Sequence, residues 1–199
     1  MGLYAAKPRF QSLLTNAAAA ATARRIHPDT LTFAGLAVAI AGGVCLALSS
    51  DVPWLLLLIP PFALARTALN ALDGMVARAS GLARPWGEVL NETADRASDV
   101  ALFGGLAWVW DPHAVAIAVA AMLLASYTGV AARAAGGPRQ YGGVMGKADR
   151  MAWLSVGSLL AYALGSAVFG WLLTAVTIGA AVTAVQRLGA ARAHFGQEP

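Results

Sequence analysis

The stretch from Asn70 to Asp99, NALDGMVARASGLARPWGEVLNETADRASD, gathers polar side chains in an otherwise apolar chain. Its acidic and amide residues include Asn70, Asp73, Glu88, Asn91, Asp95 and Asp99. Ionisable groups are expensive to hold between two hydrophobic spans, and in membrane proteins they mark functional sites. We therefore expect the functional site of this chain to lie in this stretch.

The composition of the whole chain indicates an integral membrane protein. Of its 199 residues, 58% are hydrophobic and 12% are charged, and the mean hydropathy is +0.63. Soluble domains usually carry about 25% charged residues. The net charge of +4 does not favour nucleic-acid binding, because the 14 Lys and Arg residues are scattered at the ends of apolar runs. The single cysteine, Cys45, excludes an intramolecular disulfide.

Apolar runs predict an all-α membrane fold with six transmembrane helices, each approaching the roughly 20 residues that cross a bilayer. The predicted spans are roughly 31–49, 53–77, 87–109, 113–135, 148–167 and 169–188. Residues 3–26, with Pro8 interrupting them, predict an amphipathic helix on the membrane surface before the first span. Pro60 and Pro61 predict a kink in the second span, because proline removes helix hydrogen bonds.

Three segments follow from this pattern. We expect a cytoplasmic juxtamembrane segment at 1–28, a transmembrane domain at 29–190 and a cytoplasmic tail at 191–199. The turns near 50–52, 110–112 and 165–168 contain no Lys or Arg, whereas the opposite turns are rich in both. The positive-inside rule then places both termini and the polar stretch on the cytoplasmic side of a multi-pass inner-membrane protein.

Helix periodicity predicts a metal site in the polar stretch. Asn70 and Asp73 are three residues apart, and Asn91 and Asp95 are four apart, so each pair shares one helix face. Two helix ends that present oxygen ligands to each other suit a hard divalent cation such as Mg²⁺ or Mn²⁺. Ordinary solvated surface acids are the simpler interpretation of Glu88 and Glu92.

Spacing of these residues resembles the motif of the CDP-alcohol phosphotransferase family, D-x2-D-G-x2-A-R-x8-G-x3-D-x3-D. This chain carries N-x2-D-G-x2-A-R-x8-G-x3-N-x3-D, from Asn70 to Asp95. The entry into the first span (Pro28, Leu31, Thr32) and the Gly146–Lys147 pair before the fifth span are also similar to that family. Asparagine replaces aspartate at positions 70 and 91, as in a bacterial subgroup of the family that reads N-A-L-D-G.

The resemblance implies an enzyme of phospholipid biosynthesis that displaces CMP from a CDP-linked lipid such as CDP-diacylglycerol with an alcohol. It implies a divalent metal and a homodimer. Carried over by position, the metal ligands are Asn70, Asp73, Asn91 and Asp95, with Asp95 also the general base. The residues implied in nucleotide binding are Thr32, Asp73, Gly74, Ala77, Arg78 and Gly87. Those expected at the cytoplasmic mouth, facing an anionic acceptor or the lipid phosphate, are Arg139, Lys147 and Arg150.

Other interpretations remain open at the level of sequence. With two ligands neutralised, the chain could bind a CDP-lipid or a protein partner as a scaffold without turnover. The N-x3-D-x3-D run from Asn91 to Asp99 also resembles intramembrane aromatic prenyltransferases, but no second paired-acid motif follows it. A small transporter is disfavoured, because no interrupted helix carries polar residues at the membrane midplane.

Overall fold

The computed structural model describes residues 7–196, and helices with short connections make up this whole range. In chain order the elements are α1 (Lys7–Leu13), α2 (Thr15–Ala23), α3 (Pro28–Ala47), η2 (Pro53–Leu58), α4 (Ile59–Ala79), α5 (Pro85–Gly104), η3 (Gly105–Trp108), α6 (Pro112–Ala134), α7 (Lys147–Leu164) and α8 (Val168–Phe195). The two η elements are short 3₁₀ turns. The fold is therefore all-α, as the apolar runs predict.

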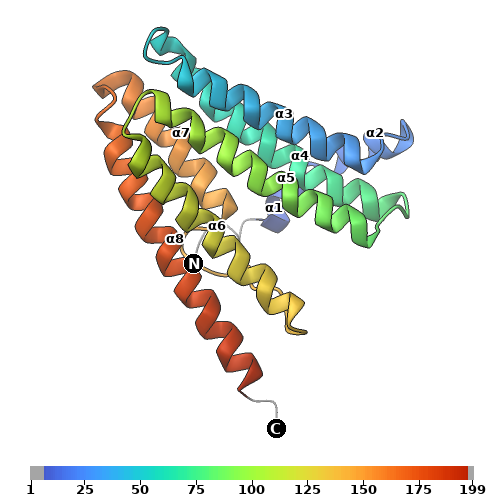
Figure 1. Ribbon diagram of the computed structural model, residues 1–199. Helices are drawn as coiled ribbons and strands as arrows, with labels where there is room; N and C mark the ends of the chain where they lie inside the picture. The colour runs from blue at the N-terminus through green and yellow to red at the C-terminus, as the bar shows by residue number, and fades with distance from the viewer. Residues whose placement is uncertain (1–6, 197–199) are drawn as a thin grey trace.

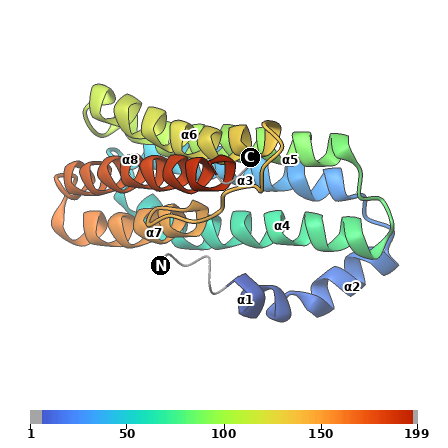
Figure 2. The same cartoon turned by 90° about the horizontal axis from the view of Figure 1, so that it is seen from below.

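Helix α3 lies between α4 and α5, while α6 and α8 form a second closely packed pair. Helix α7 packs on both α4 and α8, and α5 packs on α6, so the two groups join into one bundle (Figure 1). Turned by 90°, the bundle shows α1 and α2 below α4, on the outside of the molecule (Figure 2). The polar residues of α4 and α5 therefore face an interior shared with α3 and α7.

The N-terminal segment differs from the single interrupted helix that the sequence predicts. It forms two short helices, α1 and α2. Pro8 lies in the first described turn of α1, where proline costs no helix hydrogen bond because the backbone N–H groups of a first turn have no partner in the helix. Helix α2 is a run of alanines with only a weak apolar face, and it packs on α4. The expectation of one amphipathic helix over 3–26 is therefore wrong in form, and residues 1–6 lie outside the described range.

Pro60 and Pro61 lie inside the apolar segment Pro53–Ala79, where the 3₁₀ turn η2 changes into α4. They occupy the first turn of α4, so no hydrogen bond inside α4 is lost, and a kink of the whole segment stays a prediction. The break between the last two predicted spans is at Gly165, which adopts a positive φ of 94°. Helix α8 then continues to Phe195, beyond the predicted end of the transmembrane domain at residue 190.

Four helical segments of the described range are long and apolar enough to cross a membrane: Pro28–Ala47, Pro53–Ala79, Pro112–Ala134 and Val168–Phe195. Helices α5 and α7 are of similar length, with 20 and 18 residues, but both carry several charged residues. The charged residues of these two helices pair across the bundle interior, as described below. The prediction that all six helices span the bilayer therefore stays a prediction.

A close glycine contact sets the crossing of α3 and α5. A Cβ atom on Gly43 would lie 2.1 Å from the carbonyl oxygen of Ala101, and one on Gly105 would lie 2.2 Å from the carbonyl oxygen of Gly43. No side chain larger than hydrogen fits at this distance, and small residues allow membrane helices to approach closely. Large buried side chains such as Leu46 and Phe103 pack around the contact.

Candidate active site

The predicted motif residues of α4 and α5 meet at one point. The Asn70 Nδ2 donates to Asn91 Oδ1 at 2.6 Å and to Asp95 Oδ1 at 2.9 Å. Residues three or four apart share a helix face, which is why the pattern read from the sequence converges in space. The two helix ends therefore form one polar cluster, as predicted.

Asp73 faces the same cluster from one turn further along α4. Its side chain is only 3% exposed, and its Oδ2 accepts a hydrogen bond of 2.9 Å from Thr32 Oγ1 on α3. Its other oxygen, Oδ1, is buried and has no hydrogen-bond partner among residues 7–196. A buried carboxylate oxygen without a partner is costly, and it indicates a place where a cation or a donor binds.

These side chains line a narrow cavity between α3, α4 and α5. Its lining residues are Thr32, Gly35, Leu36, Arg66, Asn70, Asp73, Asn91, Ala94, Asp95 and Ser98. Asp73 and Asp95 thus share one environment, which the predicted function requires.

Cations surround Asp95 on its remaining sides. Lys147, at the start of α7, donates a hydrogen bond to Asp95 Oδ1. Arg66 Nη2 lies 3.5 Å from the same oxygen, and Arg96 Nη2 lies 3.6 Å from Oδ2. The carboxylate is therefore held by charged groups of three helices, α4, α5 and α7.

Below this cluster lies a fully buried ion network. Asp99 is 0% exposed and lies 3.3 Å from Arg66 and 3.0 Å from Arg150. Buried charges persist only when they are paired, because an isolated one loses its hydration. Arg150 is itself only 4% exposed, so it does not lie at the cytoplasmic mouth as expected from the sequence. That expectation was wrong because Arg150 pairs with Asp99, which lies one turn beyond Asp95 inside the bundle.

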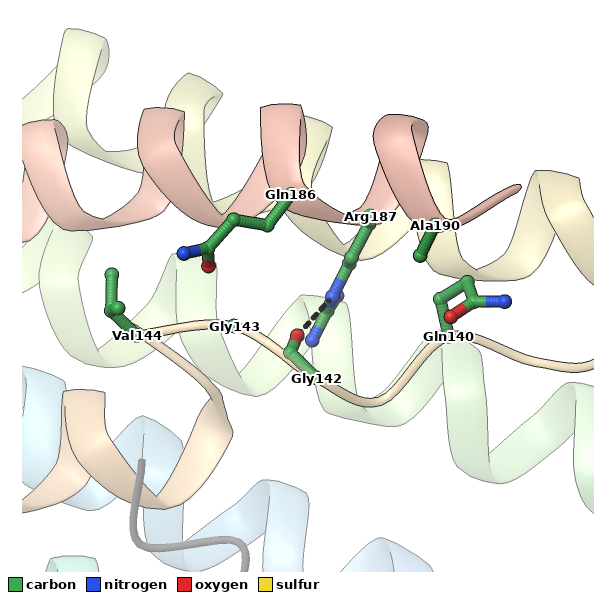
Figure 3. A pocket seen from close by; sticks show the side chains of 7 residues that line it. All are labelled: Gln140, Gly142, Gly143, Val144, Gln186, Arg187 and Ala190. Atoms are coloured by element: carbon green, nitrogen blue, oxygen red, sulfur yellow. Dashed lines mark hydrogen bonds between the residues drawn. The ribbon is translucent and has the colours of Figure 1, made fainter. Parts of the chain in front are cut away.

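A second, larger pocket of about 200 Å³ lies along α8 and the loop before α7 (Figure 3). Its lining residues are Gln140, Gly142, Gly143, Val144, Gln186, Arg187 and Ala190. Arg187 donates hydrogen bonds to the carbonyl oxygens of Gly142 at 2.9 Å, Ala125 at 2.5 Å and Tyr141 at 3.4 Å. Its guanidinium therefore fastens the loop to α6 and α8.

A sequence profile of the CDP-alcohol phosphatidyltransferase family matches residues 25–185, which include every residue of the narrow cavity. The chain belongs to the CDP-alcohol phosphatidyltransferase family. The resemblance drawn from the motif spacing is confirmed.

Named relatives agree with this assignment. The inner membrane protein YnbA of Escherichia coli K12 is 39% identical over 154 residues, which cover 75% of each protein. The phosphatidylinositol phosphate synthase of Mycolicibacterium smegmatis is 31% identical over 195 residues, covering 90% of this chain and 83% of the synthase.

Solved structures share the fold. The crystal structure of Mycobacterium tuberculosis phosphatidylinositol phosphate synthase (PgsA1) with CDP-DAG bound has a TM-score of 0.78 at 23% identity, covering 94% of this chain and 98% of that one. The same synthase in complex with manganese and citrate has a TM-score of 0.77, covering 93% and 91%. This chain is accordingly a multi-pass membrane protein.

In this member of the family, the predicted nucleotide residues other than Thr32 and Asp73 lie outside the narrow cavity. Gly74 and Ala77 are half-buried on α4, and Gly87 is half-buried near the start of α5. Arg78 is exposed, and its Nη1 would lie 3.3 Å from a Cβ atom on Gly74. The glycine therefore leaves room for the Arg78 guanidinium beside the helix.

Of the basic residues predicted at the mouth, Arg139 also has a partner. It forms an ion pair with Glu92, and its guanidinium lies 4.8 Å from the centre of the Tyr141 ring. Glu92 also lies 3.5 Å from Arg96. Glu92 is thus a partly exposed acid held between two arginines, whereas Glu88, paired at 3.3 Å with Arg133, is exposed.

The donor set of the cavity suits a hard divalent cation. Asp73 Oδ1 has a buried, unused lone pair, and Asn70 and Asn91 supply amide oxygens once the Asn70 amide makes a half-turn. Within residues 7–196, no three His, Cys, Asp or Glu side chains gather into a metal-binding group. Substrate phosphates and water would therefore have to complete the coordination, as is usual for Mg²⁺.

The sequence reasoning missed Arg66. It is 1% exposed, it lines the cavity and it contacts both Asp95 and Asp99. A signal was present, because Arg66 is the only charged residue between Asp51 and Asp73, in an otherwise apolar run. An ionisable residue in such a run indicates a functional position.

Proposed function

We propose that this chain transfers the phosphatidyl group of CDP-diacylglycerol to an alcohol and releases CMP. The observation that supports the proposal best is the shared cavity of Asp73 and Asp95, in which one carboxylate oxygen lacks a partner. The family assignment and the kinship with phosphatidylinositol phosphate synthases support the same reaction class.

The reaction breaks one bond of the diphosphate and forms one to the acceptor. The alcohol oxygen attacks the phosphorus that carries the lipid, the diphosphate P–O bond breaks, and CMP leaves with the electron pair. The proton of the alcohol passes to Asp95. An alcohol is a poor nucleophile, so a positioned carboxylate that accepts its proton contributes about 10²–10⁴-fold to the rate.

Asp73 and the amides of Asn70 and Asn91 would hold the divalent metal, Mg²⁺ or Mn²⁺. When bound, the metal supplies positive charge to the diphosphate as charge develops on the departing CMP. Thr32 orients Asp73 through its hydrogen bond. Arg78 and the small residues Gly74 and Ala77 would accept the cytidine diphosphate on the cytoplasmic side, and Gly87 would face it from α5.

We infer the remaining features from the same family. All six long helices would span an inner membrane, with both termini and the cavity on the cytoplasmic side, and the protein would act as a homodimer. Charged residues on α5 and α7 are compatible with spanning, because they pair with one another and with α4 inside the bundle.

A scaffold that binds CDP-lipid without turnover is the second candidate. The observation that favours it is the pair of amides at positions 70 and 91, which leave two carboxylates in the motif instead of four. Weak metal binding in the absence of nucleotide is expected on either account, because the pyrophosphate must supply negative ligands. Tight metal binding to the nucleotide-free protein, measured by calorimetry, would contradict this expectation.

One experiment separates the two candidates. Purified protein is incubated with CDP-diacylglycerol, Mg²⁺ or Mn²⁺ and a panel of alcohols that includes glycerol phosphate, inositol phosphate, serine and lipid alcohols. CMP release that requires both metal and one acceptor supports the transferase. Binding of CDP-diacylglycerol with no CMP release across the panel would support the scaffold.

A further inference from the structure

Charge is distributed unevenly along the narrow cavity. On one side, Asp95 is contacted by Lys147 and by Arg66, the latter at 3.5 Å. On the other side, Asp73 accepts a hydrogen bond from the neutral hydroxyl of Thr32 and forms no ion pair with any of residues 7–196. The two carboxylates of the motif therefore differ, because Asp95 is in contact with protein cations and Asp73 is not.

This difference affects where a metal ion can bind. A divalent cation beside Asp95 would lie close to two positively charged side chains, and like charges repel strongly where water is excluded. A divalent cation beside Asp73 meets a buried oxygen without a hydrogen-bond partner and no adjacent ion pair among residues 7–196. Asp73 is thus the favourable carboxylate for metal.

Space and polarity in the cavity lead to the same conclusion. The cavity has a volume of about 10 Å³, close to the size of one water-sized sphere. Arg66 Nη1, also on this cavity, is buried without a hydrogen-bond partner in the described chain. A space of this size fits one metal ion, with the phosphate that it would carry outside the cavity. The unpartnered acceptor of Asp73 suits the metal ion, and the unpartnered cationic donor of Arg66 suits the phosphate.

We propose that the cavity takes one divalent cation, held by Asp73, and that Arg66 and Lys147 are fixed cations that keep metal away from Asp95. In this arrangement Asp95 remains available to accept a proton, and Arg66 Nη1 donates to the diphosphate. The inference rests on the proposed function for the identity of the phosphate. It removes Asp95 from the set of four metal ligands that the motif spacing implies.

The first test measures metal stoichiometry. The full chain in detergent is titrated with Mn²⁺ in the presence of CDP, and free Mn²⁺ is followed by electron paramagnetic resonance. We expect one Mn²⁺ per chain and a loss of at least about tenfold in affinity for Asp73→Asn. Asp95→Asn should lose clearly less affinity, because it removes no metal ligand and only leaves Lys147 and Arg66 without their counter-charge. Two ions per wild-type chain, or an Asp95→Asn variant as weakened as Asp73→Asn, would overturn the proposal.

The second test removes a fixed cation. Lys147→Met should raise Mn²⁺ affinity by about tenfold or admit a second ion, because it removes one of the cations that contact Asp95 and so weakens the repulsion there. Lys147→Arg keeps the charge and should bind one ion as the wild type does. Arg133→Met, which removes a cation that pairs with Glu88 at the exposed surface, is the matched control.

Thermal unfolding and gel filtration show whether each variant is folded. A folded Lys147→Met protein with unchanged affinity and stoichiometry would overturn the proposal. If that variant does not fold, the comparison of Asp73→Asn with Asp95→Asn still decides it. CMP release is measured separately, so a wild-type enzyme that turns over with two ions refutes this inference and leaves the proposed function intact.

Discussion

The two pockets described above differ in whether their polar groups have hydrogen-bond partners. The pocket along α8 is the larger, yet its arginine, Arg187, donates to three backbone carbonyls and holds a loop. The narrow cavity has little volume, but Asp73 and Arg66 each present a buried atom without a partner. The unsatisfied polar atoms, and not the volume of the pocket, are therefore the reason to propose the reaction in the narrow cavity.

The largest effect is expected at Asp95. Asp95→Asn should lower kcat for CMP release by about 10²–10⁴-fold, because the amide cannot accept the proton of the alcohol. Affinity for CDP-diacylglycerol, measured by equilibrium binding, should be retained. Full rate in this variant would show that the base is another group.

A smaller effect is expected at Thr32, which orients the metal-binding carboxylate. Thr32→Val keeps the shape of the side chain but removes the hydrogen bond to Asp73 Oδ2. Loss of such a supporting contact typically costs 10–100-fold in metal affinity, so Mn²⁺ binding should weaken by about tenfold or more. Thr67→Val, which removes a hydroxyl bonded to the Ala63 carbonyl on α4, is the control.

Substitution of Arg187 tests whether the larger pocket has a structural role only. Arg187→Met should destabilise the protein by about 2 kcal/mol, since it removes several hydrogen bonds from a charged donor. The loop over 135–146 should then become sensitive to limited proteolysis, which Arg192→Met should not cause. A loss of turnover without any loss of stability would break the comparison, because it would make this pocket part of the reaction.

The smallest effect is expected where both partners are exposed. Glu88 and Arg133 form a surface ion pair between α5 and α6, and such pairs contribute about 0–1 kcal/mol. Glu88→Gln should therefore leave the thermal midpoint, metal affinity and CMP release close to wild type. A clear loss of CMP release would mean that the site extends to the start of α5.

The convergence of Asn70, Asn91 and Asp95 could be predicted because it depends on local geometry. Helical spacing places each set on one face, and a short turn between α4 and α5 brings the two ends together. The pairing of Lys147 with Asp95 could not be predicted. It depends on how α7 rotates against α5, which no local pattern determines.

The prolines and Arg150 show the same limit. Whether Pro60 and Pro61 bend the second span depends on how the 3₁₀ turn η2 changes into α4 at Ile59, and the sequence pattern does not specify that change. Arg150 was expected at the cytoplasmic mouth, facing an anionic acceptor or the lipid phosphate, and only the fold reveals that Asp99 lies opposite it. Long-range pairing decides these cases, and local sequence does not encode it.

The glycine contact between α3 and α5 has a mechanical consequence for the cavity. Thr32 and Gly43 are separated by 11 residues, roughly 16 Å at 1.5 Å per residue, and Asp95 lies about as far from Gly105. A change in the crossing angle of the two helices at this contact would therefore move Thr32 relative to Asp95. A rotation of about 4° would displace these residues by about 1 Å over that length. A shift of that size can cost an enzyme about 10²-fold in rate, so a larger side chain at Gly43 or Gly105 is expected to misalign Thr32 and Asp95.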